Sequence, residues 1–309
     1  MKNKLIVSHG GSGKLSPLVG QYLQASLSEN TRRAYSNDIQ HFLEWGGRIP
    51  ATPESVASYV AEHANRLAVA TLGRRVVAIG KAHAVKRLPS PTHSELVKAT
   101  LRGMRRIYGS TQRRVKPTLM CDIKQMVAGL RGMKGTRDKA LLLIGFAGAF
   151  RRSELVSLQV EDIQFVEEGI LIHLHRGKTD QAGLGREVAI PYVRGKCCPV
   201  KAVKDWIKMA EITTGSLFRR VERYGHVMKQ GLTAQSVALI VKEHAQAIGL
   251  DASDYSGHSL RSGLVTSAAT GGVSAWKICQ QTGHQSEVVM RRYIRDGQLF
   301  TDNPVGKIW

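Results

Sequence analysis

The sequence predicts a mainly α-helical protein of two domains, with a small antiparallel β-sheet in the second domain. The chain has 309 residues, and at roughly 100–200 residues per domain this length suggests two domains, each with its own core. Apolar residues recur at helical spacing through most of the chain, whereas residues 170–190 contain the alternation expected of strands. Hydrophobic residues make up 42% and charged residues 22% of the chain, which is the composition of a folded protein.

The first domain is predicted to be a compact helical bundle over residues 17–108. It follows residues 1–16, which contain three glycines and no apolar periodicity and are expected to be flexible. Ser28 or Asn30 can cap the first clear helix, because either side-chain oxygen can accept a hydrogen bond from the first turn. Prolines and apolar stripes mark the remaining helices: one that begins at Pro53, one through Val69 to Ile79, and one from Leu96 to Ile107.

Residues 109–118 are predicted to be a basic linker between the two domains. They are polar, lack periodicity and contain Arg113, Arg114 and Lys116. Their charge of +3 suits a strap that crosses a phosphate backbone.

The second domain is predicted over residues 119–299. Residues 137–149 are continuously apolar from Ala140 onward, as in a buried helix. A β-hairpin is predicted where large apolar residues recur at every second position on both sides of a turn: Ile170, Ile172 and Leu174, then Val188 and Ile190. From Val200 onward the pattern is helical again, with breaks at glycines.

The charge of the chain indicates a polyanionic partner. There are 45 Lys and Arg residues against 24 Asp and Glu, a net charge of +21 that divides into +10 on residues 1–109 and +11 on the rest. Such a field favours nucleic acid or an anionic membrane surface. The longest apolar run, Ala140 to Phe150, has 11 residues, whereas a membrane-spanning helix needs about 20. We therefore expect a nucleic acid partner and no membrane.

Cysteine usage and the N-terminus indicate an intracellular protein. The four cysteines lack the spacing of a metal site, so no metal is expected, and the first residues do not form a secretory signal. Reduced thiols in the cytoplasm are then the expected state.

Four local patterns in the second domain carry residues suited to chemistry. Each has a plain structural interpretation when taken alone: a helix-end ion pair, a solvated lysine at a hairpin tip, a capping histidine and a core or surface tyrosine. In chain order they contribute Arg151 with Glu154, Lys178, His258 with Arg261, and His284 with Tyr293.

Together these patterns favour phosphoryl transfer in which the protein supplies the nucleophile. Guanidinium groups stabilise the negative charge of a phosphodiester transition state through paired hydrogen bonds. A tyrosine phenol, with an ordinary pKa of about 10, needs cationic neighbours to become a competent nucleophile. No carboxylate pair, serine triad or metal-ligand cluster in the sequence competes with this interpretation.

The ordered set resembles the active-site motifs of the tyrosine recombinases (the phage-integrase family), and the resemblance runs from about residue 18 to residue 300. It implies that Arg151 is the first catalytic arginine, supported by Glu154. Arg152 stands at a position that is usually apolar in the family, and the spacing to Glu154 favours Arg151 as the phosphate-facing side chain. The remaining catalytic residues implied are the hairpin lysine Lys178, His258, Arg261, His284 and the nucleophile Tyr293.

The resemblance also implies an architecture and a reaction. Residues 17–108 would form a core-binding (SAM-like) domain and residues 119–299 the catalytic domain of a C-shaped clamp around DNA. The expected reaction is site-specific recombination through a 3′-phosphotyrosyl intermediate and a Holliday junction, without ATP, metal or other cofactor. The expected partners are double-stranded DNA with a specific target site of inverted repeats, and a homotetramer on two duplexes. The expected location is the cytoplasm, in association with the nucleoid.

Residues outside the catalytic set have more than one interpretation from the sequence. Arg32, Arg33, Arg74 and Lys81 are candidates for DNA contact or for a solvated basic face, with equal weight. Residues 300–309 end in the apolar pair Ile308 and Trp309, and can dock on a neighbouring protomer in trans or on their own protomer in cis.

Two other functions remain open from the sequence. A type IB topoisomerase shares the chemistry but relaxes supercoils as a monomer, and the helical first half argues against it. A non-catalytic DNA-binding regulator on the same fold would be expected to lack one or more catalytic residues, and none is missing here.

Overall fold

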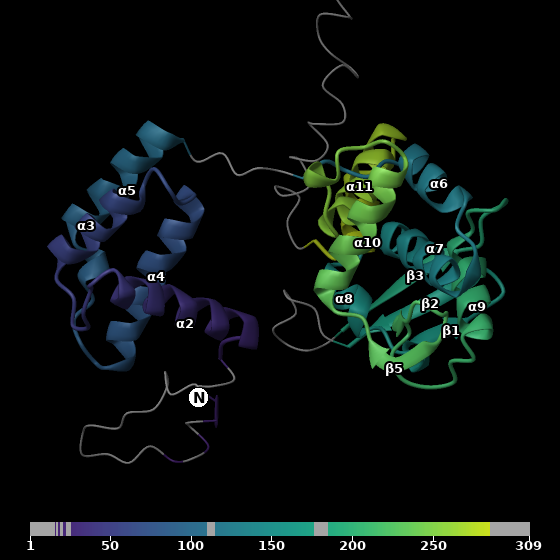
Figure 1. Cartoon of the computed structure of the whole chain (residues 1–309), viewed down its shortest axis with the longest axis horizontal. Coiled ribbons are helices and arrows are strands. Elements are labelled where there is room, and N and C mark those ends of the chain that lie inside the picture. Colours follow the sequence, from purple (N-terminus) through teal and green to yellow (C-terminus); the bar gives the residue numbers. More distant parts are fainter. Residues whose placement is uncertain are drawn as a thin grey trace, which may run out of the picture. The chain divides into compact units, whose positions relative to one another are not determined.

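A computed structural model describes residues 16, 18, 21–22, 26–109, 115–175 and 185–284 of the chain. The chain divides into two compact units, Met1–Arg113 and Arg114–Trp309 (Figure 1). Several features predicted from the sequence lie outside the described residues. These are nearly all of the N-terminal stretch 1–16, the linker arginines Arg113 and Arg114, the hairpin tip with Lys178, the nucleophile Tyr293 and the tail 300–309.

The described part of the first unit is helical. Its elements are α2 (Glu29–Glu44), α3 (Pro53–His63), α4 (Val69–Val85), the 3₁₀ turn η1 (Pro91–His93) and α5 (Glu95–Tyr108). Ser28, rather than Asn30, is the N-cap of α2, since its Oγ accepts the N–H of Thr31 at 3.3 Å. Pro53 is the first residue of α3, where its missing N–H costs no helical hydrogen bond.

The core of the first unit is built from the apolar faces of these helices. Phe42 and Tyr59 are fully buried and pack edge to face, with ring centroids 5.1 Å apart. His83 is also fully buried. Its Nε2 accepts the N–H of Ala51 at 2.8 Å, so the ring proton is on Nδ1 and is donated to the carbonyl of Ile79 at 2.8 Å. The buried imidazole thus has both nitrogens satisfied and ties the end of α4 to the loop before α3.

The second unit is mainly helical around two small sheets. Its helices are α6 (Met120–Ala128), α7 (Gly132–Ala147), α8 (Arg152–Ser157), α9 (Pro199–Met209), α10 (Ala234–Ala247), α11 (His258–Thr270) and α12 (Ala275–Thr282), with 3₁₀ turns η2 (Val160–Asp162) and η3 (Ala252–Asp254). Its strands are β1 (Ile163–Phe165), β2 (Gly169–Leu174), β3 (Arg186–Pro191), β4 (Arg219–Val221) and β5 (Val227–Gly231). The fold class predicted from the sequence is confirmed.

The predicted hairpin is present, and the sheet around it is larger than predicted. β2 and β3 pair antiparallel, and Ile172 lies opposite Val188. β1 adds a third strand on the other edge of β2.

The prediction of a helical pattern from Val200 onward, broken only at glycines, is wrong over residues 219–231, where β4 and β5 form a second antiparallel pair. These strands are short and none of their residues is buried, so they leave no apolar alternation in the sequence.

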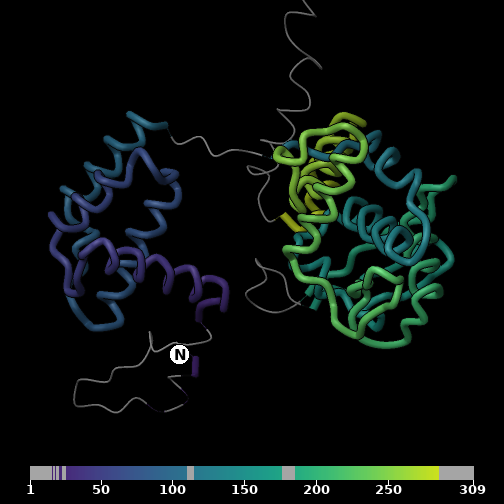
Figure 2. The backbone as a smooth tube through the Cα atoms, viewed as in Figure 1, coloured from purple at the N-terminus to yellow at the C-terminus, as the bar shows by residue number. Residues whose placement is uncertain are grey.

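Helix α7 is the buried centre of the second unit. Every residue from Ala140 to Phe146 is buried, and α7 contacts α6, α9 and α11. Figure 2 shows that α12, the yellow end of the described chain, lies in the same unit as the teal helices α7 and α8. No helix in the described ranges is long and apolar enough to span a membrane.

One charged network lies inside this core. Arg137 and Asp138 are buried neighbours, and two guanidinium nitrogens of Arg137 donate to Asp138 Oδ1 at 2.8 and 2.6 Å. The other carboxylate oxygen is 3.0 Å from Nε2 of His244 on α10. The network connects α7 to α10, and each buried charge in it has a partner.

Candidate active site

The site is organised by the junction between α7 and α8. Ala149 follows the end of α7 with a left-handed backbone (φ 48°), a conformation that is uncommon for a residue with a Cβ. The reversal leaves the Ala149 carbonyl without a helical partner. Arg261, which is 2% exposed on α11, donates from Nη1 to this carbonyl at 2.7 Å. The strained junction therefore holds the second arginine of the predicted set.

The first arginine is held by a buried carboxylate. Glu154 is 3% exposed, its Oε2 accepts the backbone N–H of Arg151 at 3.0 Å, and its Oε1 accepts the Arg151 guanidinium. Burial by itself raises the pKa of Glu154, but the hydrogen bonds and charge of Arg151 outweigh it and leave that pKa below its usual value. Arg152 is exposed and its side chain covers Gly257, so Arg151 is the arginine that faces Glu154.

His258 and Arg261 lie one turn apart at the start of α11. The N–H of His258 donates to Ser256 Oγ at 3.1 Å, which orders the first turn. Desolvation, and after it the charges of Arg261, Arg152 and Arg151, lower the pKa of His258. The imidazole is therefore neutral at pH 7 and can accept a proton.

His284 follows α12, which ends at Gly283 in the left-handed conformation (φ 67°). Its Nε2 is 3.1 Å from Nη2 of Arg261, and its Nδ1 is 2.7 Å from Oγ1 of Thr282. Because a guanidinium can only donate, Nε2 accepts and the ring proton is assigned to Nδ1. The Thr282 hydroxyl donates in turn to the carbonyl of Ile278 at 2.7 Å.

This setting keeps His284 uncharged. Burial, followed by the charges of Arg261 and Arg151 and of other nearby cationic groups, lowers the pKa of His284 to about 4. A neutral imidazole with its lone pair toward Arg261 orients that guanidinium without repelling it.

Five residues of the predicted catalytic set thus meet in the second unit. Glu154 contacts Arg151, and Arg261 contacts His284; His258 is close enough to Arg151 and Arg261 for their charges to act on it.

Three further residues support the site and were not predicted. Nη1 of Arg186 donates to the carbonyl of Gln281 at 2.9 Å, and its Nη2 lies 3.6 Å from Glu154 Oε2. Gln281 Nε2 donates to the carbonyl of Ala147 at 2.9 Å, and Thr282 orients His284. A signal for Arg186 exists in the sequence, because it has the same strand parity as Val188 and Ile190, which face the core.

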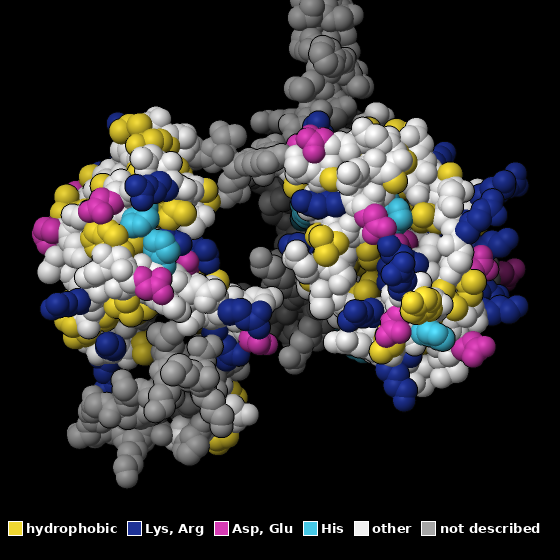
Figure 3. All heavy atoms as spheres, viewed as in Figure 1, with side chains coloured by type: hydrophobic (Ala, Val, Ile, Leu, Met, Phe, Trp, Pro, Cys, Tyr) yellow, Lys and Arg dark blue, Asp and Glu magenta, His cyan; other side chains and the backbone are white. Residues whose placement is uncertain are grey.

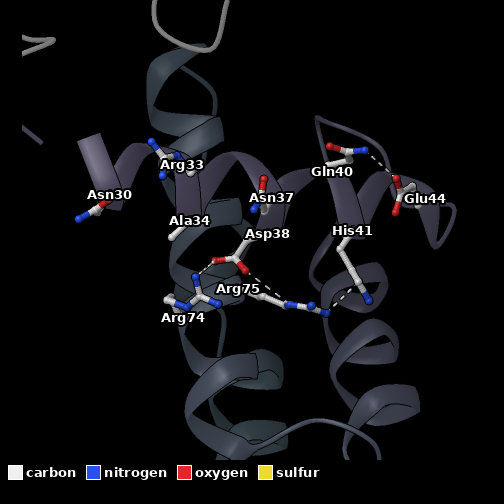
Figure 4. A pocket seen from close by; sticks show the side chains of 10 residues that line it. All are labelled: Asn30, Arg33, Ala34, Asn37, Asp38, Gln40, His41, Glu44, Arg74 and Arg75. Atoms are coloured by element: carbon white, nitrogen blue, oxygen red, sulfur yellow. Dashed lines mark hydrogen bonds and ion pairs between the residues drawn. The ribbon is translucent and has the colours of Figure 1, made fainter. Parts of the chain in front are cut away.

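A candidate DNA-contact site, separate from the active site, lies on the first unit where α2 and α4 meet. Arg33 and Arg74 line a hollow of about 580 Å³. Figure 4 shows Asp38 of α2 pointing between Arg74 and Arg75 of α4, with Oδ2 3.0 Å from Nη1 of Arg74. Burial raises the pKa of Asp38, and the neighbouring arginines oppose that rise only in part. Arg33 also forms an i,i+4 ion pair with Glu29 at 2.9 Å.

Arg75 lies deeper in the same hollow. Its side chain is 12% exposed, and its Nη1 donates to Tyr59 Oη at 2.9 Å and to His41 Nδ1 at 2.8 Å. His41 Nδ1 must be unprotonated to accept, and burial together with Arg75 lowers the pKa of His41. Arg75 is thus a fixed part of the wall, whereas Arg74, with 44% of its side chain exposed, remains accessible.

The other predicted contact residues are divided between different surfaces. Arg32 and Lys81 line a separate, smaller hollow beside α2 and α4. Lys116 pairs with Asp254 of the second unit at 2.8 Å, which raises the pKa of Lys116. On the face shown in Figure 3, Lys and Arg side chains cover parts of both units.

In chemical terms the second unit holds two fixed guanidiniums and two neutral imidazoles, an arrangement suited to an anionic phosphodiester.

The family model described as "Phage integrase family" matches residues 119–298. The chain is 38% identical over 308 residues to an integrase/recombinase xerD homolog of Selenomonas ruminantium, covering 96% of this chain and 90% of that protein. It is 26% identical over 269 residues to the recombinase cre of Escherichia phage P1, covering 80% and 77%.

Solved structures share the fold. The XerH site-specific recombinase bound to its palindromic difH substrate gives a TM-score of 0.64 at 16% identity, covering 90% of this chain and 78% of that one. A lambda integrase dimer bound to a COC′ core site gives 0.64 at 14% identity, covering 94% and 84%. The chain belongs to the phage integrase family, the tyrosine recombinases, and is an enzyme of that class.

Proposed function

We propose that this chain is a site-specific DNA recombinase that cuts and rejoins duplex DNA through a 3′-phosphotyrosyl intermediate on Tyr293. The observation that carries this proposal is the pair of fixed guanidiniums. Arg151 is held by Glu154, and Arg261 is held by the Ala149 carbonyl and by His284. Such donors need little reorganisation when a scissile phosphate binds, and this preorganisation is a main source of rate enhancement.

In the cleavage step, the phenolic oxygen of Tyr293 attacks the phosphorus and the bond from phosphorus to the 5′ oxygen breaks. The phenolic proton passes to His258, whose lowered pKa leaves it neutral and able to accept. The Lys178 ammonium gives a proton to the departing 5′ oxygen. The products are a 3′-phosphotyrosyl ester and a free 5′-hydroxyl.

The two arginines contact the non-bridging oxygens and offset the charge that develops in the transition state. In comparable sites, one preorganised donor is worth about 3–4 kcal/mol of barrier. Glu154 acts on Arg151 and not on the phosphate. His284 keeps Nη2 of Arg261 oriented before DNA arrives, and assists at the non-bridging oxygens once DNA is bound.

Strand exchange is the reverse reaction with a new partner. A 5′-hydroxyl from a second duplex attacks the phosphotyrosyl ester, takes the phosphoryl group and returns the proton to Tyr293. The ester retains the energy of the broken bond, so neither ATP nor a metal enters the balance. Two exchanges joined by a Holliday junction require two duplexes, and we propose a homotetramer on paired sites of inverted repeats.

We propose that the first unit acts as a core-binding domain over residues 17–108, and residues 119–299 as the catalytic domain. Support comes from the basic side chains around α2 and α4, above all the accessible Arg74. Arg113 and Arg114 would cross the phosphate backbone between the domains, and the enzyme would work in the cytoplasm on nucleoid DNA.

The test uses DNA that flanks the gene, prepared as nicked duplex fragments from which the short cleaved strand diffuses away. Wild-type protein is expected to form an adduct that survives denaturation, and Tyr293→Phe is expected to bind equally well without forming one. Tight binding without an adduct in the wild type would favour a DNA-binding regulator. An adduct on these fragments, with relaxation of a separate supercoiled plasmid but no exchange between two sites, would favour a type IB topoisomerase.

A further inference from the structure

Arg186 occupies a costly position for a charged residue. It is the first residue of β3, and its side chain is 24% exposed while Val188 and Ile190, of the same strand parity, face the core. Desolvation is the largest influence on the pKa of Arg186 and lowers it, although Glu154 opposes the change. An apolar residue would fill an inward position of this kind without that cost.

One side of Arg186 faces the carboxylate that holds Arg151. Nη2 of Arg186 is 3.6 Å from Oε2 of Glu154, the oxygen that accepts the Arg151 N–H. Within the described residues Nη2 is buried and has no hydrogen-bond partner, so its interaction with Glu154 is one of charge. Glu154 therefore lies between two guanidiniums, and both favour its ionised form.

The other side of Arg186 faces the end of α12. Nη1 donates at 2.9 Å to the carbonyl of Gln281, one of the last carbonyls of that helix, where a cation is also favoured by the helix dipole. A Cβ placed on Gly283 would lie 2.8 Å from Nε of Arg186, so the guanidinium is against the Gly283 backbone. The next residue is His284, which orients Arg261.

We propose that Arg186 is a positioning residue for phosphoryl transfer: it holds Arg151, through Glu154, and His284, through the end of α12, in one geometry. The proposal rests on the proposed function of the site. A lysine cannot replace it fully, because one ammonium cannot reach both the Glu154 carboxylate and the Gln281 carbonyl with the fixed fork of a guanidinium.

The first test compares Arg186→Gln and Arg186→Lys with the wild type in single-turnover formation of the covalent adduct on the nicked fragment. Arg194→Gln, at an exposed position shortly after the same strand, controls for the loss of one positive charge. We expect Arg186→Gln to slow the adduct by about 10- to 100-fold with unchanged DNA affinity. The Lys variant should recover part of the rate, and Arg194→Gln should match the wild type.

A second substrate separates positioning from general damage. In it a methyl group replaces one non-bridging oxygen of the scissile phosphate, which removes the charge that the arginines offset. Arg186→Gln should lose at least several-fold less rate on this methylphosphonate than on the phosphate. Equal losses on both substrates, or a wild-type rate on the phosphate, would overturn the proposal.

Two further readouts locate the effect. If Arg186 acts partly through Glu154, the double variant Arg186→Gln, Glu154→Gln should lose less rate than the product of the two single fold-losses, because the shared route is lost only once; fully multiplicative losses would contradict that route. In the free protein, Arg186→Gln should speed hydrogen exchange at the amides of Gly283 and His284, both of which donate to the Cys279 carbonyl. This readout needs no DNA, and unchanged exchange would refute the contact with α12 even if the wild type formed no adduct. The absence of a wild-type adduct would count against the proposed function alone.

Discussion

Replacing His284 should make the second unit less sensitive to acid. The pKa of His284 is lowered to about 4, whereas an unfolded histidine titrates near 6.5. Between these two pH values the histidine binds a proton in the unfolded chain but not in the folded site, so the free energy of unfolding falls as the pH decreases through this window. One pKa unit corresponds to about 1.4 kcal/mol, so the free energy of unfolding should fall by about 2 kcal/mol between pH 7.5 and pH 5 because of this residue alone.

The assay is urea unfolding of wild type and His284→Gln at both pH values, followed by tryptophan fluorescence, to which Trp206, fully buried in the second unit, contributes. Glutamine does not titrate, so the variant should lose about 2 kcal/mol less than the wild type on acidification. His226→Gln, at an exposed position in the β4–β5 hairpin, controls for the loss of a histidine elsewhere. If wild type and His284→Gln lost the same free energy, His284 would not be held neutral by its surroundings.

Three other perturbations test separate parts of the molecule. Asp138→Ala should lower the free energy of unfolding by about 3–5 kcal/mol, measured in urea, because it leaves Arg137 and His244 buried without their shared carboxylate; a loss below about 1 kcal/mol would contradict the network. Arg74→Ala should weaken DNA binding and reduce the slope of log affinity against log salt by about one, and an unchanged slope would exclude a phosphate contact. Deleting residues 300–309 should abolish cooperative DNA binding if the tail docks in trans, whereas cooperativity retained at the wild-type level would favour docking in cis.

The elements that could be predicted from the sequence are those with strong local patterns. The side chain of Ser28 and the ring of Pro53 mark helix starts by short-range chemistry. The alternation through Ile172 and Val188 predicts the β2–β3 pair because both strands have one face in the core. β4 and β5 could not be found in this way, because none of their residues is buried and they present no apolar face to a core.

In the candidate site, too, local patterns could be predicted from the sequence and long-range contacts could not. Motif spacing singled out Glu154 beside Arg151, which lie three residues apart at the start of α8, with Arg151 as its N-cap. Spacing could not reveal that the Ala149 carbonyl receives Arg261, or that Arg186 reaches Gln281, since these contacts join segments distant in the chain. Such contacts depend on tertiary packing, and only the inward strand position of Arg186 hinted at one of them.

The most direct test of the central claim is to identify the residue that carries the DNA. The adduct would be isolated after denaturation, digested with trypsin and a nuclease, and analysed by tandem mass spectrometry. The account predicts a nucleotide joined through its 3′ phosphate to the phenolic oxygen of Tyr293, in the tryptic peptide Tyr293-Ile294-Arg295. A nucleotide on another residue, or a linkage through a 5′ phosphate, would contradict it.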